Sequence, residues 1–353
     1  MCLLPPSSSL LQYLCNMYNR PAALAPEEVL LQRGIEFARK AWWVGLRADQ
    51  RAAQQLREIR FEFPQLSRDV VEVFCGETVV VAKALCELVE PSPLRPKHGF
   101  LTFQCRQLFT ARDGAAKPKE LRRLGGFLER LFRDHVVETE GLCVLPGRRV
   151  WSVQVSVTVV NDDGNVRDAA QWATMAVLRH LRRPELTIRG DQIVVHPPHE
   201  RDPVPLALHY CPVSCSFAVP PPAPAALPTG AAAAGAGPLR MLVDPTATET
   251  AAAACVVVTA INAEGMVCAL ERTEGCDVPW ETVQECIAVA TTLTPAIAAL
   301  MEEAMREHEA RRKETLRSQF LWAQKRLGVG RKDDGEPKAT DDNAPAKAMK
   351  TES

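Results

Sequence analysis

The residues best placed for chemistry lie in a short polar loop, Asn161 to Asn165, which is followed directly by Val166 and Arg167. Asparagine, aspartate and glycine tolerate left-handed backbone and often precede a helix. The free N–H groups at a helix start, together with an arginine, suit an anion such as phosphate. We therefore consider Asn165 and Arg167 as candidate phosphate-binding residues. A helix cap without a ligand is the simpler interpretation, and both interpretations stay open.

The segments on either side of this loop have the periodicity of elements that hold it in place. From Trp151 to Val159, apolar and polar residues alternate, which predicts a half-buried strand. From Ala169 to His180, apolar residues recur every three or four positions, and Pro184 ends the pattern. The sequence thus predicts one strand–loop–helix unit at the centre of the chain.

Basic residues accumulate between Arg106 and Arg133, on or beside a predicted helix whose leucines form an apolar stripe. The eight basic residues are Arg106, Arg112, Lys117, Lys119, Arg122, Arg123, Arg130 and Arg133. A solvated outer helix face is the default interpretation of such charges. The alternative is a groove that follows a phosphate backbone, because guanidinium groups bind phosphate oxygens without reading base sequence.

Other types of site find little support in the sequence. The sequence contains no GxSxG, HExxH, P-loop or GxGxxG motif. It therefore gives no sign of a hydrolytic triad or of these nucleotide-binding motifs. Cys211 and Cys215 are four residues apart, and His196 and His199 are three apart, but no second half-site follows. We predict no metal site, no cofactor and no catalytic residue.

Composition describes an ordinary globular chain. Of 353 residues, 46% are apolar and 24% charged, and the net charge of −1 gives no overall attraction to polyanions. The 12 cysteines are scattered and include no CxxC pair, which favours reduced thiols inside a cell. The first residues lack the basic and apolar regions of a secretion signal, and we expect no membrane-spanning segment.

The order of elements predicts an α+β fold with antiparallel or mixed sheets and helices on one face. Strands followed by a helix are expected in residues 57–184 and again in 239–310, and Thr294-Pro295 is expected to start a separate last helix. We expect five regions along the chain. They are an N-terminal extension (1–29), a first subdomain (30–219), a Pro/Ala/Gly-rich linker or insertion (220–238), a second subdomain with a charged C-terminal helix (239–328) and a disordered tail (329–353).

Several motifs together resemble the RNase PH family, and among its members a ring subunit of the eukaryotic RNA exosome matches best. They are Arg47-Ala-Asp49-Gln-Arg51, Cys86-Glu-Leu-Val-Glu-Pro91, Glu140-Gly-Leu-Cys-Val144, the Asp163-Gly-Asn165 loop, Asp168-Ala-Ala170, Arg182-Arg-Pro184 and Glu200-Arg-Asp-Pro-Val-Pro-Leu206. Gln50 departs from the glycine usual in the first motif. The resemblance covers residues 30–320 and implies a pseudo-duplicated β-α-β-α module, the ribosomal protein S5 domain 2-like fold.

The family resemblance also implies an activity, in which phosphate attacks the terminal phosphodiester of RNA and releases a nucleoside diphosphate. Arg167 and Arg130 match arginines at the family's phosphate site, but Val166 removes a hydroxyl found in active members. An aspartate of the second half is replaced by alanine or cysteine within Ala253-Ala254-Cys255. We therefore expect no carboxylate beside Arg167 in the second sheet, and a catalytically inert chain.

The resemblance implies a structural and RNA-contacting subunit of the exosome ring, with RNA contacts at Arg106, Arg112, Arg130, Asn165 and Arg167. The implied partners are other RNase PH-like subunits, paired as a heterodimer within a hexameric ring, cap subunits with RNA-binding domains, and RNA, but no membrane. The implied location is the nucleus and nucleolus, and also the cytoplasm. Two alternatives remain open: an active phosphate-dependent 3′-to-5′ exoribonuclease, and an assembly scaffold without RNA contact.

Overall fold

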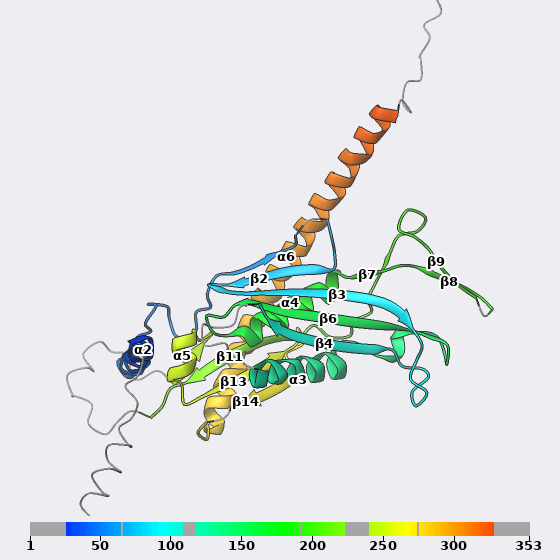
Figure 1. Ribbon diagram of the computed structural model, residues 1–353. Coiled ribbons are helices and arrows are strands. Elements are labelled where there is room, and N and C mark those ends of the chain that lie inside the picture. Colours follow the sequence, from blue (N-terminus) through cyan, green and yellow to red (C-terminus); the bar gives the residue numbers. More distant parts are fainter. Residues whose placement is uncertain are drawn as a thin grey trace, which may run out of the picture. The chain divides into compact units, whose positions relative to one another are not determined.

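The structure is a computed structural model that describes residues 26–64, 66–108, 118–190, 192–222, 240–273 and 275–327 (Figure 1). It comprises two units, residues 1–308 and 309–353, and each is described by itself. The predicted N-terminal extension, linker and C-terminal tail lie largely outside the described residues, and the five predicted regions stay a prediction.

The first sheet contains six strands, with β1-β2-β3-β6-β4 as the main order and β5 paired with β6. The strands are β1 (Ile59–Glu62), β2 (Val70–Cys75), β3 (Thr78–Val89), β4 (Phe100–Gln107), β5 (Cys143–Leu145) and β6 (Arg149–Asn161). The pairing is antiparallel from β1 through β3 to β6, whereas β4 runs parallel to β6, so the sheet is mixed, which the predicted fold class includes. The reason is that a helix separates β4 from β6 in the chain, so the connection is a crossover and not a hairpin.

The second sheet contains four antiparallel strands in the order β12-β11-β13-β14. They are β11 (Val213–Val219), β12 (Leu242–Val243), β13 (Cys255–Ile261) and β14 (Val267–Arg272). Two short pairs complete the strands: β7 (Arg182–Arg183) with β10 (Val204–Pro205), and β8 (Leu186–Arg189) with β9 (Gln192–Val195). Every residue of β11 and β13 is buried, so these two strands are the core of this sheet.

The helices are α2 (Pro26–Trp43), α3 (Pro118–His135), the 3-10 helix η1 (Glu140–Leu142), α4 (Val166–His180), α5 (Ala247–Ala252) and α6 (Trp280–Leu327). Helices α3 and α4 pack against the sheets, which gives the α+β architecture that the sequence predicts (Figure 1). α4 contacts β2, β3 and β6 of the first sheet and β11 of the second, and it is buried almost all round. α4 therefore joins the two halves through one core.

The predicted central unit is confirmed in its parts. Along β6, Trp151, Val153, Val155, Val157 and Val159 are buried while the residues between them are partly exposed. The buried face lies on the side where apolar residues of α4 pack, because a period of two places alternate side chains on one face of a strand. The strand and helix therefore hold the loop between them at one end of the core.

α6 contradicts the prediction of a separate helix starting at Thr294. It is continuous, with Pro295 inside it, and Thr294 is not a cap: its hydroxyl donates to the Ala290 carbonyl four residues earlier, at 2.9 Å. Thr291 makes the same type of bond to the Ile287 carbonyl, at 2.8 Å. Threonine hydroxyls that bind carbonyls of the preceding turn are common inside helices and help to accommodate a bend.

α6 also differs from the expectation that no segment resembles a membrane span. By length and composition alone, the part from Trp280 to Trp322 is apolar enough to cross a membrane, with a mean hydropathy of 1.4 in its most apolar window. Cys286, Ala290, Ile297 and Met301 are buried in the core of the first unit. Their spacing of four or seven residues is that of a helix with one face against the protein's own body.

Gly164, at the end of the loop before α4, lies against the backbone of the second half. Its φ of +85° is in the left-handed region, and a Cβ added there would come within 2.4 Å of backbone atoms of Thr246 and Ala247. The neighbouring Asp163 carbonyl accepts a hydrogen bond from the Ala247 N–H at 3.1 Å. Only glycine allows this close approach of the two chain segments.

We predict that Gly164→Ala destabilises the protein by about 3 kcal/mol or more, since both the backbone strain and the overlap with fixed backbone atoms oppose folding. The matched control is Gly147→Ala, where φ is +75° and no atom lies within 4 Å of the added Cβ, so that only strain of about 1 kcal/mol applies. Urea unfolding measures both. Equal effects of the two substitutions would show that the contact at Gly164 is unimportant.

Candidate nucleic-acid interface

The predicted helix start is correct, but Asn165 uses its side chain differently from the expectation. Asn165 is the residue before α4, has a φ of 56°, and makes no capping bond with its side chain. Its Nδ2 instead donates to Oδ1 of Asp244, at 2.7 Å, in the buried interior. Asparagine tolerates this backbone conformation, which explains the residue type. The amide of Asn165 is thus used to join the two halves and is not directed to a ligand.

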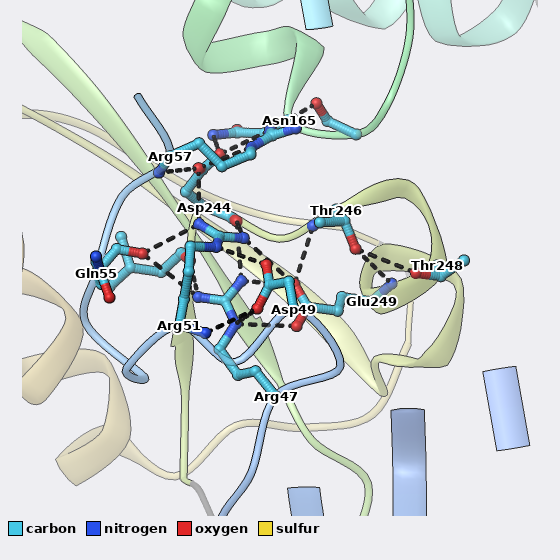
Figure 2. Close-up of polar contacts among 12 residues, drawn as sticks. Arg47, Asp49, Arg51, Gln55, Arg57, Asn165, Asp244, Thr246, Thr248 and Glu249 are labelled. Atoms are coloured by element: carbon cyan, nitrogen blue, oxygen red, sulfur yellow. Dashed lines mark hydrogen bonds and ion pairs between the residues drawn. The ribbon is translucent and has the colours of Figure 1, made fainter. Parts of the chain in front are cut away.

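Asp244 is the centre of a buried ionic cluster (Figure 2). Arg57 donates to both of its carboxylate oxygens, from Nη2 at 2.8 Å and from Nε at 2.9 Å, and its backbone N–H donates at 2.9 Å. Arg51 donates from Nη1 at 3.1 Å. Arg57 also donates to the carbonyls of Asp163 and Gly164 at 3.0 and 3.2 Å. One aspartate of the second half therefore binds the start of the first half and, through Arg57, the loop before α4.

A second buried pair lies beside the first. Nη2 and Nε of Arg47 donate to the two oxygens of Glu249, at 2.6 and 2.9 Å, and both side chains are almost fully buried. Glu249 also accepts from the Thr246 backbone N–H, and the Thr246 hydroxyl accepts from the Glu249 N–H, which is a capping box at the start of α5. A buried charge is tolerated only when it is paired and hydrogen-bonded, and this pair meets both conditions.

The Arg47 to Arg51 motif supplies two arginines of this cluster and explains its unusual residue. Gln50 has a φ of 64°, a conformation that glycine adopts without strain and that costs other residues about 1–2 kcal/mol. Glycine is therefore the residue that this turn favours. The turn keeps its shape with glutamine because Arg47 and Arg51 are both bound to acidic groups of the second half.

Asp168, in the first turn of α4, is a third buried carboxylate. Its Oδ2 accepts a hydrogen bond from the Ser216 N–H of β11, at 2.6 Å. Burial raises the pKa of Asp168 to about 6, although hydrogen bonds at the site act in the opposite direction. This residue connects α4 to the second sheet.

A pocket of about 570 Å³ opens beside the start of α4. Residues of both halves line it. The first half contributes Gln107 of β4, Glu120, Leu121, Arg123 and Leu124 of α3, Val159 and Asp162, and the helix start from Gly164 to Arg167. The second half contributes Ser216 of β11, Pro245, Ala247, Thr250, Ala251, Ala253 to Val256, Val258 and Thr273. The arrangement brings the predicted helix N-terminus and Arg167 to one cavity. An anion of the size of phosphate fits this volume, and the N–H groups of the α4 start favour negative charge.

The wall that the second half contributes to this pocket is apolar or weakly polar. Ala253, Ala254 and Cys255 stand there, and the described lining residues from Ser216 onward include no aspartate or glutamate. Burial, and to a smaller extent the neighbouring Cys276, raise the pKa of the Cys255 thiol to about 11. A thiol with this pKa neither accepts nor donates a proton readily near neutral pH.

The expectation of no carboxylate beside Arg167 in the second sheet is wrong. Glu271 of β14 accepts from Nη1 of Arg167 at 3.1 Å, and its other oxygen is paired with Arg130 of α3. The Arg167 guanidinium also lies over the Phe127 ring, 5.2 Å from the ring centre. The expectation rested on the start of β13 alone, whereas β14 lies beside β13 in the sheet and places Glu271 opposite Val258. Glu271 and Arg130 do not line the pocket.

Arg106, another of the predicted RNA-contacting arginines, is not joined to Arg167 by Glu271. Arg106 lies on β4, and its Nε donates to the Thr158 hydroxyl of β6 at 3.1 Å, at an exposed position. Gln107, the next residue, lines the pocket. Arg112 lies outside the described residues. The structure thus joins Arg130 and Arg167 through Glu271 and places Arg106 on the strand next to the pocket.

Sequence reasoning missed the structural importance of Arg47, Arg57, Asp244 and Glu249. For Glu249 a signal was present, because Thr246-Ala-Thr-Glu249 has the spacing of a capping box and predicts the short helix α5. For Asp244 and Arg57 there was none, since they are 187 residues apart and their pairing depends on the tertiary fold. Among the described residues, no group of three metal-binding side chains is found.

We predict that Asp244→Asn destabilises the protein at neutral pH by about 3–5 kcal/mol, because it leaves buried guanidinium charge without its partner. Burial would raise the pKa of Asp244, but Arg57 overcomes this effect and lowers it to about 2, from 3.8. The carboxylate therefore stabilises the wild-type protein above about pH 4, and about 2 kcal/mol of this stability disappears as the pH falls towards 2. Urea unfolding at several pH values measures this change, which the variant should lack.

The matched control for that experiment is Asp277→Asn, because Asp277 is fully exposed and 3.6 Å from Arg272. An exposed ion pair of this kind adds little to stability, so the control should unfold at the same urea concentration as the wild type. If Asp244→Asn behaved like this control, the cluster would not hold the fold together.

Comparisons with known proteins agree with this geometry. A family model described as "3′ exoribonuclease family, domain 1" matches residues 55–184, which run from the strands of the first sheet through α4. Relatives named exosome complex component RRP45 include one from Danio rerio, 32% identical over 274 residues, and one from Homo sapiens, 31% identical over 273 residues. Each match covers 76% of this chain, but 65% and 58% of the respective relative. The chain therefore spans about 60% of the length of these relatives.

Two further comparisons extend the match. Exosome complex component RRP45A from Arabidopsis thaliana is 28% identical, over 78% of this chain and 87% of the relative. Among solved structures, an Archaeoglobus fulgidus exosome with RNA bound to the active site superposes with a TM-score of 0.62 at 18% identity, covering 77% of this chain and 98% of that one. At this identity the likeness establishes the fold, and the predicted RNase PH-like module is confirmed. The chain is therefore similar, in sequence over residues 55–184 and in fold, to members of the RNase PH, or 3′ exoribonuclease, family.

Proposed function

We propose that the chain is a non-catalytic, RNA-contacting ring subunit of an RNA exosome that supports 3′-to-5′ RNA processing and degradation, including that of rRNA. Its family, its fold and the names of its relatives support the ring assignment. We infer the absence of catalysis from one observation: in the wall that the second half contributes to the pocket, Ala253, Ala254 and Cys255 supply no carboxylate.

The chemistry explains why this wall matters. In phosphorolysis, phosphate attacks the terminal phosphodiester, and the leaving oxygen of the shortened RNA must take up a proton. A positioned carboxyl group accelerates such proton transfer by roughly 10²–10⁴-fold. The alanine methyls have no proton to transfer, and the pKa of Cys255, about 11, makes its thiol a poor substitute. The three buried carboxylates nearby, Asp168, Asp244 and Glu249, are bound within the fold.

The partners in this proposal are other RNase PH-like subunits, paired as a heterodimer within a hexameric ring, together with cap subunits and RNA. The proposed location is the nucleus and nucleolus, and also the cytoplasm. Arg106, Arg112, Arg130 and Arg167 supply the RNA contacts through phosphate, which would make binding independent of sequence. Asn165 stays in the proposal through its backbone at the helix start alone, because its side-chain amide is bound to Asp244.

One observation favours an active phosphorolytic enzyme as the alternative, namely the carboxylate of Glu271 beside Arg167. Against it, Glu271 is outside the pocket lining and both of its oxygens are engaged by arginines. We predict that the purified chain, alone or with its ring partners, releases no nucleoside diphosphate from RNA when phosphate is supplied. Thin-layer chromatography of labelled RNA products measures this. Phosphate-dependent release that disappears in Glu271→Gln would establish the enzyme instead.

We further predict that replacing Arg106, Arg112, Arg130 and Arg167 by alanine weakens RNA binding by the assembled ring, because phosphate contacts release counterions. The slope of log affinity against log salt should become shallower by about 1 for each arginine–phosphate interaction that the substitutions remove. Fluorescence anisotropy with single-stranded RNA measures both quantities. The matched control replaces Arg60, Arg179, Arg201 and Arg240, which are ion-paired and partly or largely exposed, and which do not line the pocket. Equal effects of the two sets, or none, would favour a scaffold without specific RNA contact.

A further inference from the structure

Glu271 connects two arginines that come from different helices. Its Oε2 accepts from Nη1 of Arg167 on α4 at 3.1 Å, and its Oε1 accepts from Nη2 of Arg130 on α3. Each carboxylate oxygen is therefore occupied by one guanidinium group. Three elements that are separate in the sequence meet at this point, because β14 packs against α3.

This arrangement is the one that a bound phosphate would adopt between the same arginines. Carboxylate and phosphate both offer oxygens to the N–H groups of guanidinium at similar distances. Arg167 is fixed further by the Phe127 ring, and its side chain is only 21% exposed. Arg130 is 66% exposed, so the pair lies at the surface, where an external anion has access.

From this geometry we propose that Glu271 is an internal competitor of RNA phosphate: its carboxylate neutralises Arg130 and Arg167, and its charge sets the affinity of this surface for RNA. The inference rests on the proposed function in one respect, namely that these arginines face RNA. It makes Glu271 an affinity-determining residue, which neither the motifs nor the pocket lining indicate. An RNA phosphate must displace the Glu271 carboxylate before the phosphate can bind the guanidinium groups of both Arg130 and Arg167.

The test is the isosteric substitution Glu271→Gln in the full chain, which removes the negative charge and keeps the shape. We expect RNA to bind about tenfold more tightly, the effect of one additional charge-assisted contact. We also expect the salt slope to steepen by about 1. Inorganic phosphate, titrated by calorimetry, should bind the variant more tightly than the wild type. Adding Arg130→Ala to the variant should return the RNA affinity towards the wild-type value.

The matched control is Glu302→Gln. Glu302 pairs with Arg179 at 2.9 Å on an exposed surface, so the substitution causes the same change of net charge and also breaks an ion pair. Its RNA affinity should change by less than about twofold, because Arg179 lies in the last turn of α4 and Arg167 in its first, and a single exposed charge is screened by salt. Equal gains in both variants would show a general charge effect, and no gain in Glu271→Gln would show that Glu271 does not compete with RNA. Either result overturns the inference.

These outcomes are distinct from a failure of the proposed function. If the wild-type chain released nucleoside diphosphates with phosphate, the non-catalytic assignment would fall whatever the affinity of Glu271→Gln. If the wild-type chain released none and Glu271→Gln bound phosphate and RNA no better, the inference alone would fall. Melting temperatures of the two glutamine variants, compared with the wild type, verify that both are folded.

Discussion

The buried ionic cluster around Asp244 is the interaction on which the rest of the structure depends. Arg57 brings the beginning of the first half to Asp244 in the second half, and it also binds the carbonyls of the loop before α4. Buried charges are costly unless they are fully paired, so the cluster is stable only when every member is in place. This requirement ties the loop, the start of α4 and the turn before α5 to one geometry (Figure 2).

The same cluster explains how the pocket keeps its shape in a chain that we propose to be non-catalytic. The pocket keeps a helix N-terminus, Arg167 and a suitable volume, because these features follow from the packing of α4 between the sheets. Three acidic groups of the second half near it have structural partners: Asp244 binds Arg57, Glu249 binds Arg47, and Glu271 binds Arg130 and Arg167. Of these, only Glu271 offsets positive charge on the surface, at Arg130 and Arg167.

Much of the fold followed from local patterns in the sequence. The alternation from Trp151 to Val159 predicted β6, and the spacing of apolar residues after Asn165 predicted α4, because both patterns reflect burial of one face. Local patterns did not predict the parallel pairing of β4, which depends on where the chain returns after α3. Pro295 suggested a break in the last helix, but the helix continues through it. The hydroxyls of Thr291 and Thr294, just before the proline, donate to the carbonyls of Ile287 and Ala290.

The candidate site was predictable only in part, since it combines local and long-range features. The Asn165 turn and Arg167 follow from the loop sequence, whereas the role of Glu271 depends on the neighbouring position of β13 and β14. The most direct measurement of the central claim is a crystal structure of the full chain soaked with inorganic phosphate and a short single-stranded RNA. We expect Asp244 and Glu249 to stay bound to Arg57 and Arg47, with no acidic side chain of the second half turned towards the phosphate groups that bind beside Arg167. Phosphate bound there, with an acidic side chain of the second half turned towards it, would contradict the account.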